Sequence, residues 1–574
     1  GELAGKYDAL LAANLDQRYP VDRWIMLTRV RAWTVYQGFS QEICFHSLDR
    51  FWLDDNKGIW RFKAPTGQGQ RIDLTVEVEM LPGQNTVRLS FHRLPARRGK
   101  GKLSDRAAVQ LIVRPDIEDR NFHENTKAYQ GLEAAWPAAF QCRLDAFIFT
   151  PSAGRVLTLS ISEGIFVWQP EWHYMVHRRL EKERGMDPDS DLWSPGYFSV
   201  FLEGGKTAIL TASVNERPSL PGDVASSVSG KSKSLEKTLR ASLAAFVVRR
   251  GPLKSVIAGY PWFLDWGRDA LIFTRCLIQV GKIPEAEDIL KLLGGFEDQG
   301  TLPNMIHGGR AANRDTSDAP LWYIVALADL VRKKRSRAFL SETVEGRTIR
   351  EIALSIGRWY IEGTPNRIRM DSETGLIFSP AHFTWMDTDN PACTPREGYC
   401  VEIQALWAAA LHFLAAIDPV GSADWRNLSK KVRQSILQWF YTKKGYLSDC
   451  LHASEHESVA CARADDAVRP NQLLALTLDA ISDRFVGRNI LDACQRLLVP
   501  GAIRSLADAS TEFPLEIRHH GLLLGDPHRP YRGNYAGDED TSRKPAYHNG
   551  TAWTWLYPSY SEAYVQVYGA RGLV

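Results

Sequence analysis

Apolar and polar residues alternate with a period of two through most of residues 1–214. In the stretch "IDLTVEVEM", Ile72, Leu74, Val76, Val78 and Met80 fall on one face, and the turn "PGQN" is followed by a second alternating run. The stretches "RVLTLSISEG" and "YFSVFLEGGKTAIL" repeat the pattern, the latter around a Glu-Gly-Gly-Lys turn. This alternation predicts that residues 1–214 form an antiparallel β-sandwich domain.

The period of the pattern becomes helical from residue 235. Residues 215–234, "NERPSLPGDVASSVSGKSKS", are rich in Ser, Gly and Pro and carry no period, which is typical of a linker. Beyond them, apolar residues recur at i, i+3 and i+4 in about ten segments, in consecutive pairs separated by polar, Trp-rich loops. The predicted helical segments are 235–250, 268–282, 283–296, 318–334, 344–363, 402–417, 423–441, 469–481, 484–498 and 550–569. Helix pairs of this kind favour an (α/α)6 toroid over residues 235–574, although ten helices are one pair short of such a ring.

Composition narrows the class of protein. A length of 574 residues implies two or more domains, and a net charge of +3 predicts no nucleic-acid partner. Eight scattered cysteines lack metal-ligand spacing, so we expect reduced thiols, a cytoplasmic location, and neither metal nor cofactor. The sequence has no apolar run of membrane-spanning length, so no membrane partner is expected, and it leaves the oligomeric state open.

The first polar loop of the helical half is "GYPWFLDWGRDA" (259–270). It brings together Trp262, Asp265, Trp266, Arg268 and Asp269. A carboxylate near a helix start can simply accept backbone N–H groups, which is the plainer interpretation of the last of these residues. That interpretation leaves the crowding of two indoles, two carboxylates and a guanidinium unexplained. We therefore predict a ledge on which indole rings stack against a sugar and carboxylates accept its hydroxyl protons.

Two further joins between a loop and a helix follow at 301–309 and 314–323. Asn304 and Trp322 are candidates for the same pocket mouth, although turn chemistry or packing would explain either one alone.

The densest stretch of charge and aromatic surface is "HFTWMDTDNPACTPREGYCVE" (382–402). Asp387 lies in its loop beside Trp385, and Glu402 begins the next helix. Neighbouring aromatic rings would partly dry the site, and desolvation raises the pKa of a carboxyl group and suits it to general-acid work. Arg396 and Glu402 are candidate substrate contacts, with simple ion pairing and helix-dipole effects as the plainer interpretations.

Two more loops complete the candidate site. "RPNQ" contributes Arg469 and Asn471, and "AYHNGTAWTWLYP" contributes Tyr547, His548 and Trp553. Carboxylates, aromatic rings and amide or guanidinium donors, without a phosphate loop or a Ser-His-Asp or Cys-His arrangement, indicate glycoside recognition and cleavage by paired carboxylates.

These stretches resemble the glucosidase half of glycogen debranching enzymes, the amylo-α-1,6-glucosidase family in its bacterial and archaeal form. The matching motifs are "WFLDWGRDA", "LPN", "LIFSPAHFTWMDTD", "TPREGYCVEIQALW", "RPNQLLALTL", "GAIRSL", "DPHRPYRGNYAG" and "AYHNGTAWTWL". The first half is similar to the β-sandwich module of the family through "GKYDALLAANL", "YPVDRWIMLTRVRAW", "RPDIEDRNFH" and "SPGYFSVFLEGGKTAIL", so the resemblance covers almost the whole chain.

The resemblance implies an inverting barrel glycosidase that removes α-1,6-linked glucose at trimmed branches of glycogen or another α-glucan. The Asp of the Thr-Trp-Met-Asp motif, here Asp387, is the expected general acid. The expected general base is a Glu beyond the Tyr-His-x-Gly motif, in a segment that we expect this chain to lack. We accordingly interpret Glu402 as a substrate contact and Glu562 as a helix residue. Two alternatives stay open: a non-catalytic α-glucan-binding homologue, and a barrel hydrolase that acts on another α-glucoside.

Overall fold

The structure is a computed structural model that describes residues 3–16, 18–20, 23–96, 101–215 and 234–569. Contacts within the chain divide it into two compact units that meet between Leu239 and Arg240, and each unit is treated by itself. The predicted linker, apart from its two end residues, lies outside the described residues.

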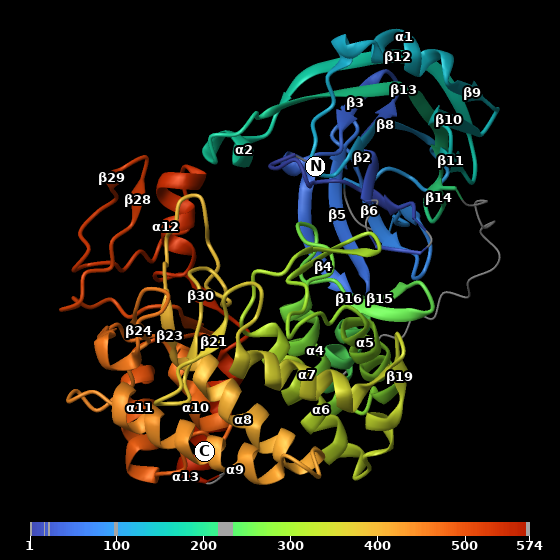
Figure 1. Cartoon of the computed structure of the whole chain (residues 1–574). Coiled ribbons are helices and arrows are strands. Elements are labelled where there is room, and N and C mark those ends of the chain that lie inside the picture. Colours follow the sequence, from blue (N-terminus) through green and yellow to red (C-terminus); the bar gives the residue numbers. More distant parts are fainter. Residues whose placement is uncertain (1–2, 17, 21–22, 97–100, 216–233, 570–574) are drawn as a thin grey trace. The chain divides into compact units, whose positions relative to one another are not determined.

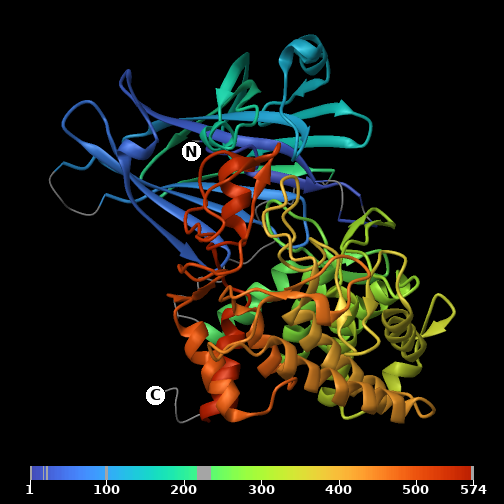
Figure 2. The same cartoon turned by 60° about the vertical axis from the view of Figure 1, so that its left-hand side comes forward.

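The first unit consists of two antiparallel sheets (Figure 2). The six-stranded sheet has the order β1-β2-β8-β13-β12, with β3 paired to β2, and the eight-stranded sheet has the order β4-β5-β6-β7-β14-β11-β10-β9. The six-stranded sheet comprises β1 (Leu11–Asn14), β2 (Arg23–Tyr36), β3 (Phe39–Glu42), β8 (Val109–Asn121), β12 (Ile165–His177) and β13 (Asp189–Leu202). The eight-stranded sheet comprises β4 (Leu48–Asp54), β5 (Lys57–Pro65), β6 (Arg71–Met80), β7 (Thr86–Arg93), β9 (Phe140–Cys142), β10 (Ala146–Ser152), β11 (Arg155–Ile161) and β14 (Thr207–Val214).

One apolar core joins the two sheets. Ile117 and Trp193 from the six-stranded sheet are fully buried in the same cluster as Leu74, Leu159 and Leu210 from the eight-stranded sheet. The alternation of side chains along a strand places these residues on one face, as the sequence pattern predicts. The predicted antiparallel, β-rich first half is therefore confirmed.

The second unit is helical (Figure 1). Its principal helices are α3 (Leu235–Phe246), α4 (Gly267–Gln279), α5 (Ile283–Gly295), α6 (Ala319–Lys334), α7 (Ile349–Glu362), α8 (Val401–Ile417), α9 (Ser422–Ser435), α10 (Leu473–Thr477), α11 (Arg484–Gln495) and α13 (Tyr557–Tyr568). They correspond to the ten segments predicted from the apolar period, so the predicted helical second half is also confirmed. Short strands join them, among them β15 (Val247–Arg250), β16 (Leu253–Val256), β23 (Gly398–Cys400), β24 (Cys450–His452), β25 (Arg463–Ala464) and β30 (Ala552–Trp553).

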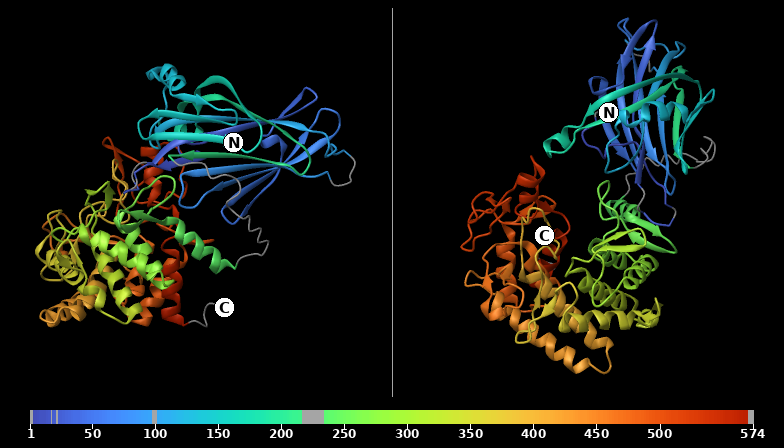
Figure 3. Two further views of the ribbon diagram at one scale, coloured as in Figure 1. Left: turned by 90° about the vertical axis from the view of Figure 1, so that its right-hand side faces the viewer. Right: turned by 45° about the horizontal axis from the view of Figure 1, so that its top comes forward.

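The helices alternate between a buried and an amphipathic type. In α8, 14 of 17 residues are buried, so this helix lies inside the unit. In α9 only Trp425, Ser429, Val432 and Ser435 are buried, at the spacing of one helix face, so this helix covers the outside. The helices α4, α6, α8, α10 and α13 are successive neighbours in space, and the chain follows an arc from green to red (Figure 3).

Local sequence signals set several helix ends. The hydroxyl oxygen of Thr348 accepts a hydrogen bond from the backbone N–H of Glu351, whose carboxylate accepts one from the backbone N–H of Thr348, and α7 begins after this capping box. Asp483 caps α11 by accepting from the backbone N–H groups of Phe485 and Val486.

Three predicted helix boundaries are wrong. The segment 550–569 becomes helical only at Tyr557, because residues 552–553 form β30 against β27 (Ala502–Arg504). The segment 469–481 contains a 3-10 turn before the short helix α10. The segment 235–250 leaves the helix after Phe246 to form the hairpin β15–β16. In each case pairing with a neighbouring strand or turn overrides the local apolar period.

Among the described residues, no helix combines the length and the apolar character that a membrane crossing requires.

Candidate active site

Two carboxylates bind the guanidinium of Arg268 at the start of α4. Arg268 donates from Nε to Oδ2 of Asp318 at 2.6 Å and from Nη1 to Oδ2 of Asp387 at 3.0 Å. Nη2 donates to the carbonyl oxygen of Thr384 at 3.0 Å. Asp318 also accepts from the hydroxyl of Thr316 at 2.6 Å. The starts of α4 and α6 and the loop before α8 therefore meet at one cation.

The glycine of the "WGRD" motif permits this approach. A Cβ on Gly267 would lie 2.0 Å from the carbonyl oxygen of Pro303, and the backbone N–H of the glycine donates to the carbonyl oxygen of Asn304. Only a residue without a side chain brings the two backbones this close, so the glycine sets the position of the first turn of α4.

Desolvation raises the pKa of two carboxyl groups beside Arg268, those of Asp387 and Asp269. The pKa of Asp387 is raised by desolvation, with the charge and hydrogen bond of Arg268 opposing the effect and the charge of Asp318 adding to it. The pKa of Asp269 is raised to about 6, chiefly by burial, with Arg268 opposing and Asp387 adding. Asp269 makes no ion pair within the part of the chain that the structure describes. Both groups therefore hold a proton to a higher pH than an ordinary aspartate does.

Aromatic rings stand beside the carboxylates. The Trp385 ring lies 5.3 Å from His548, 5.6 Å from Trp553 and 5.2 Å from Trp555, measured between ring centroids. Tyr547 lies 4.9 Å from Trp553, and burial together with the charges of Tyr535, Asp387 and Asp269 raises its pKa, which places its phenol near both carboxyl groups. The rings form one wall next to Asp387, the arrangement on which a pyranose ring can stack.

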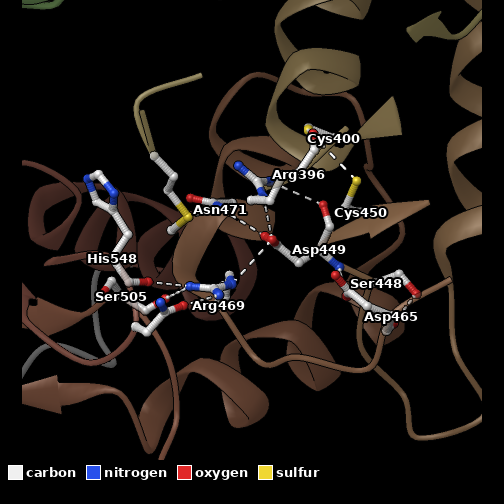
Figure 4. A network of polar contacts seen from close by, with 12 residues as sticks. Arg396, Cys400, Ser448, Asp449, Cys450, Asp465, Arg469, Asn471, Ser505 and His548 are labelled. Carbon is white, nitrogen blue, oxygen red and sulfur yellow. Dashed lines mark hydrogen bonds and ion pairs between the residues drawn. The ribbon is translucent and has the colours of Figure 1, made fainter. Parts of the chain in front are cut away.

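A fully buried ionic network lies behind this wall, centred on Asp449 (Figure 4). Arg396 binds Glu402 in a bidentate pair with two contacts of 2.6 Å, and its Nε lies 2.6 Å from Oδ2 of Asp449. Arg469 lies 3.4 Å from the same oxygen and donates to the backbone oxygens of Ser505 and His548.

The network reaches the aromatic wall through one amide. Asn471 donates from Nδ2 to Oδ1 of Asp449 at 2.8 Å and accepts at its Oδ1 from the indole Nε1 of Trp385 at 2.7 Å. Four of the five N–H groups of Arg396 donate hydrogen bonds, to Glu402, to Thr384 and to the carbonyl of Asp449, while its Nε contacts Asp449 only as an ion pair. Arg396 and Glu402 therefore mainly hold other residues in place.

Several buried polar atoms near the carboxylates lack a hydrogen-bond partner among the described residues. They are Oδ1 of Asn304, Nδ1 of His382, Oγ1 of Thr388 and Nδ1 of His548. Burial and the positive charges of Arg469, Arg268, Arg396 and His382 hold the pKa of His548 well below its usual value, so its imidazole is neutral. Unpaired buried groups are rare in native proteins, and here they offer hydrogen bonds to a polar ligand.

The structure brings together most but not all of the predicted site residues. Contacts link Arg268 to Asp387 and join the rings of Trp385, Tyr547, His548 and Trp553, and Asp269 and Trp266 lie at the start of α4. Asn471 connects this group to the network of Arg396, Glu402 and Arg469. Asp265 is instead buried against Arg250 and Ser255 of the β15–β16 hairpin. Trp322 lies in the apolar core, with Arg275 5.4 Å above its ring, and Trp262 is 54% exposed in its loop.

Three residues of the site are not among the residues predicted from the sequence: Asp318, Asp449 and Trp555. Asp318 immediately precedes α6, a position like that of Asp269 in the first turn of α4 and Glu402 in the first turn of α8. That shared position was a usable signal, because a carboxylate recurs at the start of successive inner helices. Asp449 has no such signal, since it lies in a turn without neighbouring aromatic residues.

The geometry combines a proton donor, neutral and charged hydrogen-bond partners and a stacking wall. Among the described residues no group of three or more His, Cys, Asp or Glu side chains has the arrangement of a metal site.

A family model described as "Amylo-alpha-1,6-glucosidase" matches residues 241–572, and a second, "Glycogen debranching enzyme N terminal", matches residues 1–209. The chain belongs to the amylo-alpha-1,6-glucosidase family. This family resemblance, predicted from the motifs, is confirmed.

The chain is also similar to one curated relative and to solved structures. It is 23% identical over 401 residues to the glycogen debranching enzyme of Saccharomyces cerevisiae, across 54% of this chain, and it spans about a quarter of the length of that relative. A bacterial glucoamylase solved in complex with acarbose has a TM-score of 0.51 and 11% identity, over 99% of this chain and 85% of the other. A putative kojibiose phosphorylase from human microbiome has a TM-score of 0.43 and 8% identity. The glucoamylase supports the arrangement of a β-rich unit followed by a helical one.

Proposed function

We propose that this protein hydrolyses the α-1,6 bond of single glucose units at trimmed branch points of glycogen or a related α-glucan. The observation that carries the proposal is Asp387. Its side chain is 29% exposed, its pKa is raised, it pairs with the cation of Arg268, and it stands in the Thr-Trp-Met-Asp motif. A carboxyl group with a raised pKa holds its proton to a higher pH than an ordinary aspartate, which suits general-acid protonation of a glycosidic oxygen.

The mechanism we propose uses two carboxylates with inversion. Asp387 donates its proton to the leaving oxygen while a second carboxylate activates water on the opposite face, roughly 6.5–9.5 Å away. We assign no general base among the described residues. Asp318 and Glu402 are held in ion pairs with Arg268 and Arg396. Asp269 adjoins Arg268 in the first turn of α4, and we assign it to a glucose hydroxyl instead.

The remaining residues divide into contacts and supports. The proposed glucose contacts are Arg268, Asp269, Trp266, Trp385, Tyr547, His548 and Trp553, because they lie beside Asp387 or belong to the aromatic wall. Arg396, Glu402, Arg469 and Asn471 are proposed to hold that wall in register through the hydrogen bond from Trp385 to Asn471. Neutral His548 can donate to or accept from a hydroxyl group without adding charge.

The fold that we propose for the helical unit is the (α/α)6 barrel, and for the first unit a β-sandwich. The alternation of buried and amphipathic helices and the common core of the two sheets support these two assignments.

The test is glucose release from a branched glucan that phosphorylase has trimmed. We expect free glucose from the wild-type chain, and none from the same chain incubated with unbranched amylose of equal reducing-end concentration. Equal release from maltose or amylose would indicate another α-glucoside specificity. Retained glucan binding without any glucose release would favour a non-catalytic glucan-binding protein.

A further inference from the structure

A cavity with a volume of about 200 Å³ lies beside the buried network of Arg396, Asp449 and Arg469. One wall is polar and comes from Thr394, Arg396, Asp449, His452, Asp465, Arg469 and Asn549. The facing wall is largely apolar and comes from residues 513–517 together with Pro530. Asp387 and the aromatic wall of Trp385, Tyr547 and Trp553 are not part of its lining.

The apolar wall is built around one held aromatic ring. Phe513 stacks on His452 with ring centroids 4.4 Å apart and an interplanar angle of 13°, and the guanidinium of Arg463 lies 5.0 Å from the ring centroid of Phe513. The backbone of Phe513 is anchored to the carboxylate of Asp466. Leu515 is half-buried beside it. Apart from the carboxylate of Glu516, which binds Arg518, such a wall packs against C–H groups and offers no hydrogen bond from its side chains.

The polar wall keeps unused hydrogen-bonding capacity. Thr394 is only 3% exposed, and its Oγ1 lacks a hydrogen-bond partner among the described residues. Nη2 of Arg469 makes one bond, to Oδ1 of Asn549, and so retains one N–H. Asp465 binds His452 and the backbone of Asp449, and carboxylate oxygens accept further bonds. A ligand in the cavity therefore meets both donors and acceptors.

The charge of the lining decides the class of ligand. Two arginines face three carboxyl groups, those of Asp449, Asp465 and Glu516. Both arginines are already engaged in ion pairs with Asp449, so neither offers a free cation to a phosphate or carboxylate. An anion would be repelled, while a neutral molecule with several hydroxyl groups on one face and C–H groups on the other matches the two walls.

From these contacts we propose that the cavity is a second carbohydrate site that takes one neutral hexose unit, either a free monosaccharide or the end of a glucan chain. Its volume would hold roughly seven water molecules at their liquid density, which is about the size of one hexose. Glucose is the natural probe, and this choice of sugar rests on the proposed function. The affinity of the cavity for a neutral sugar does not depend on hydrolysis.

The experiment compares ligand-observed NMR titrations of the full chain with glucose, maltoheptaose and glucose 6-phosphate. Leu515→Trp fills the cavity from its apolar wall, and Thr394→Val removes the unpaired hydroxyl at nearly constant volume. Leu522→Trp is the matched control, because Leu522 is 72% exposed and does not line the cavity. Circular dichroism and thermal unfolding establish that each variant is folded.

We expect Leu515→Trp to weaken one sugar-binding event at least tenfold and Thr394→Val to weaken it about threefold, while Leu522→Trp leaves it unchanged. Loss of glucose binding identifies a free-sugar site, and loss of maltoheptaose binding alone identifies a chain-end site. Binding that neither cavity variant alters would overturn the inference and leave the cavity to water. Tighter binding of glucose 6-phosphate than of glucose would overturn the assignment to neutral sugars.

The outcome is separable from that of the proposed function. Leu515→Trp should release glucose from trimmed glucan within twofold of the wild-type rate, because Leu515 lies outside the Asp387 site. Sugar binding that depends on Leu515 in a chain that releases no glucose would sustain the second site and refute the hydrolytic proposal.

Discussion

Arg268 and Asp387 lie 119 residues apart in the sequence and form an ion pair in which Nη1 of the arginine is 3.0 Å from Oδ2 of the aspartate. The same guanidinium binds Asp318 more closely, at 2.6 Å. A permanent cation beside a proton donor normally lowers the pKa of the donor. Here burial outweighs that effect, and the cation is shared with a second carboxylate whose charge raises the pKa of Asp387. Asp318 is therefore expected to control how readily Asp387 holds its proton.

Replacing Asp387 by Asn tests the proton donor directly. General-acid catalysis contributes roughly 10²–10⁴-fold, so we expect glucose release to fall by at least about 10²-fold. The amide keeps the shape and polarity of the side chain, so binding of the trimmed glucan should stay within a few-fold. Initial rates of glucose release and a binding isotherm measure the two quantities.

Asp389→Asn is the matched control for that substitution, because the side chain of Asp389 is 60% exposed and lies two residues away in the same loop. It should retain the wild-type rate. Turnover preserved in Asp387→Asn would refute the assignment of the acid.

Replacing Asp318 by Asn should change the pH dependence of hydrolysis. The negative charge of Asp318 raises the pKa of Asp387, and its removal also leaves Arg268 to pair with Asp387 alone. Both effects lower the pKa of Asp387, so the acid loses its proton at a lower pH. The alkaline limb of the profile of glucose-release rate against pH should therefore shift to lower pH, by about one pH unit or less.

The corresponding control is Asp315→Asn, since Asp315 is exposed and binds Asn313 rather than Arg268. An alkaline limb that stays in place in Asp318→Asn, or moves to higher pH, would contradict the positioning role.

Replacing Asp269 by Asn should stabilise the protein at neutral pH. Its folded-state pKa of about 6 lies above the usual value of 3.8, so the folded state binds more protons between these values and the free energy of unfolding falls as pH rises through that window. At pH 7 the ionised carboxylate costs stability that an amide would not, on the order of 1–3 kcal/mol. At pH 3.5 the carboxyl group is protonated and the advantage should vanish.

Thermal unfolding of wild type and Asp269→Asn at the two pH values measures this difference. A variant that is less stable at pH 7 would show that the carboxylate is stabilised by its surroundings. Glucose release should fall in the same variant if Asp269 contacts the substrate.

Glu402→Gln should strongly destabilise the helical unit. It breaks a bidentate pair whose side chains are 2% and 4% exposed and leaves the charge of Arg396 buried with less compensation. Loss of one partner of a buried pair costs about 3–5 kcal/mol. Glu455→Gln breaks the exposed pair with Arg367 and should cost about 1 kcal/mol or less. Chemical denaturation followed by tryptophan fluorescence compares the two, and equal effects would contradict a structural role for Glu402.

The architecture was largely predictable because both apolar periods are strong. Val87, Leu89 and Phe91 are buried in β7 while the residues between them are partly exposed, as the alternation requires. The helices α8 and α9 appear where the helical period places them. Helix ends were less predictable, because pairing partners such as Ile503 with Trp553 come from distant sequence. Local periodicity carries no information about such partners.

The site was predictable where chemistry and aromatic residues crowd together, as around Asp387. It was not predictable where the direction of a side chain decides its role. Asp265 and Asp269 lie four residues apart in one motif, yet the first binds Arg250 in the hairpin and the second lies among the charges of Arg268, Asp387 and Asp318. Arg396 is a candidate ligand contact by sequence, but four of its five N–H groups donate to partners within the chain.

The polar side chains of the site lie in loops or in the first turns of inner helices, whereas the rest of α8 is buried on nearly all sides. Exchange of a loop can therefore alter which sugar is accepted without repacking the helices. Substrate range in this architecture is open to diversification by loop variation, while folding selects for the same buried helices throughout.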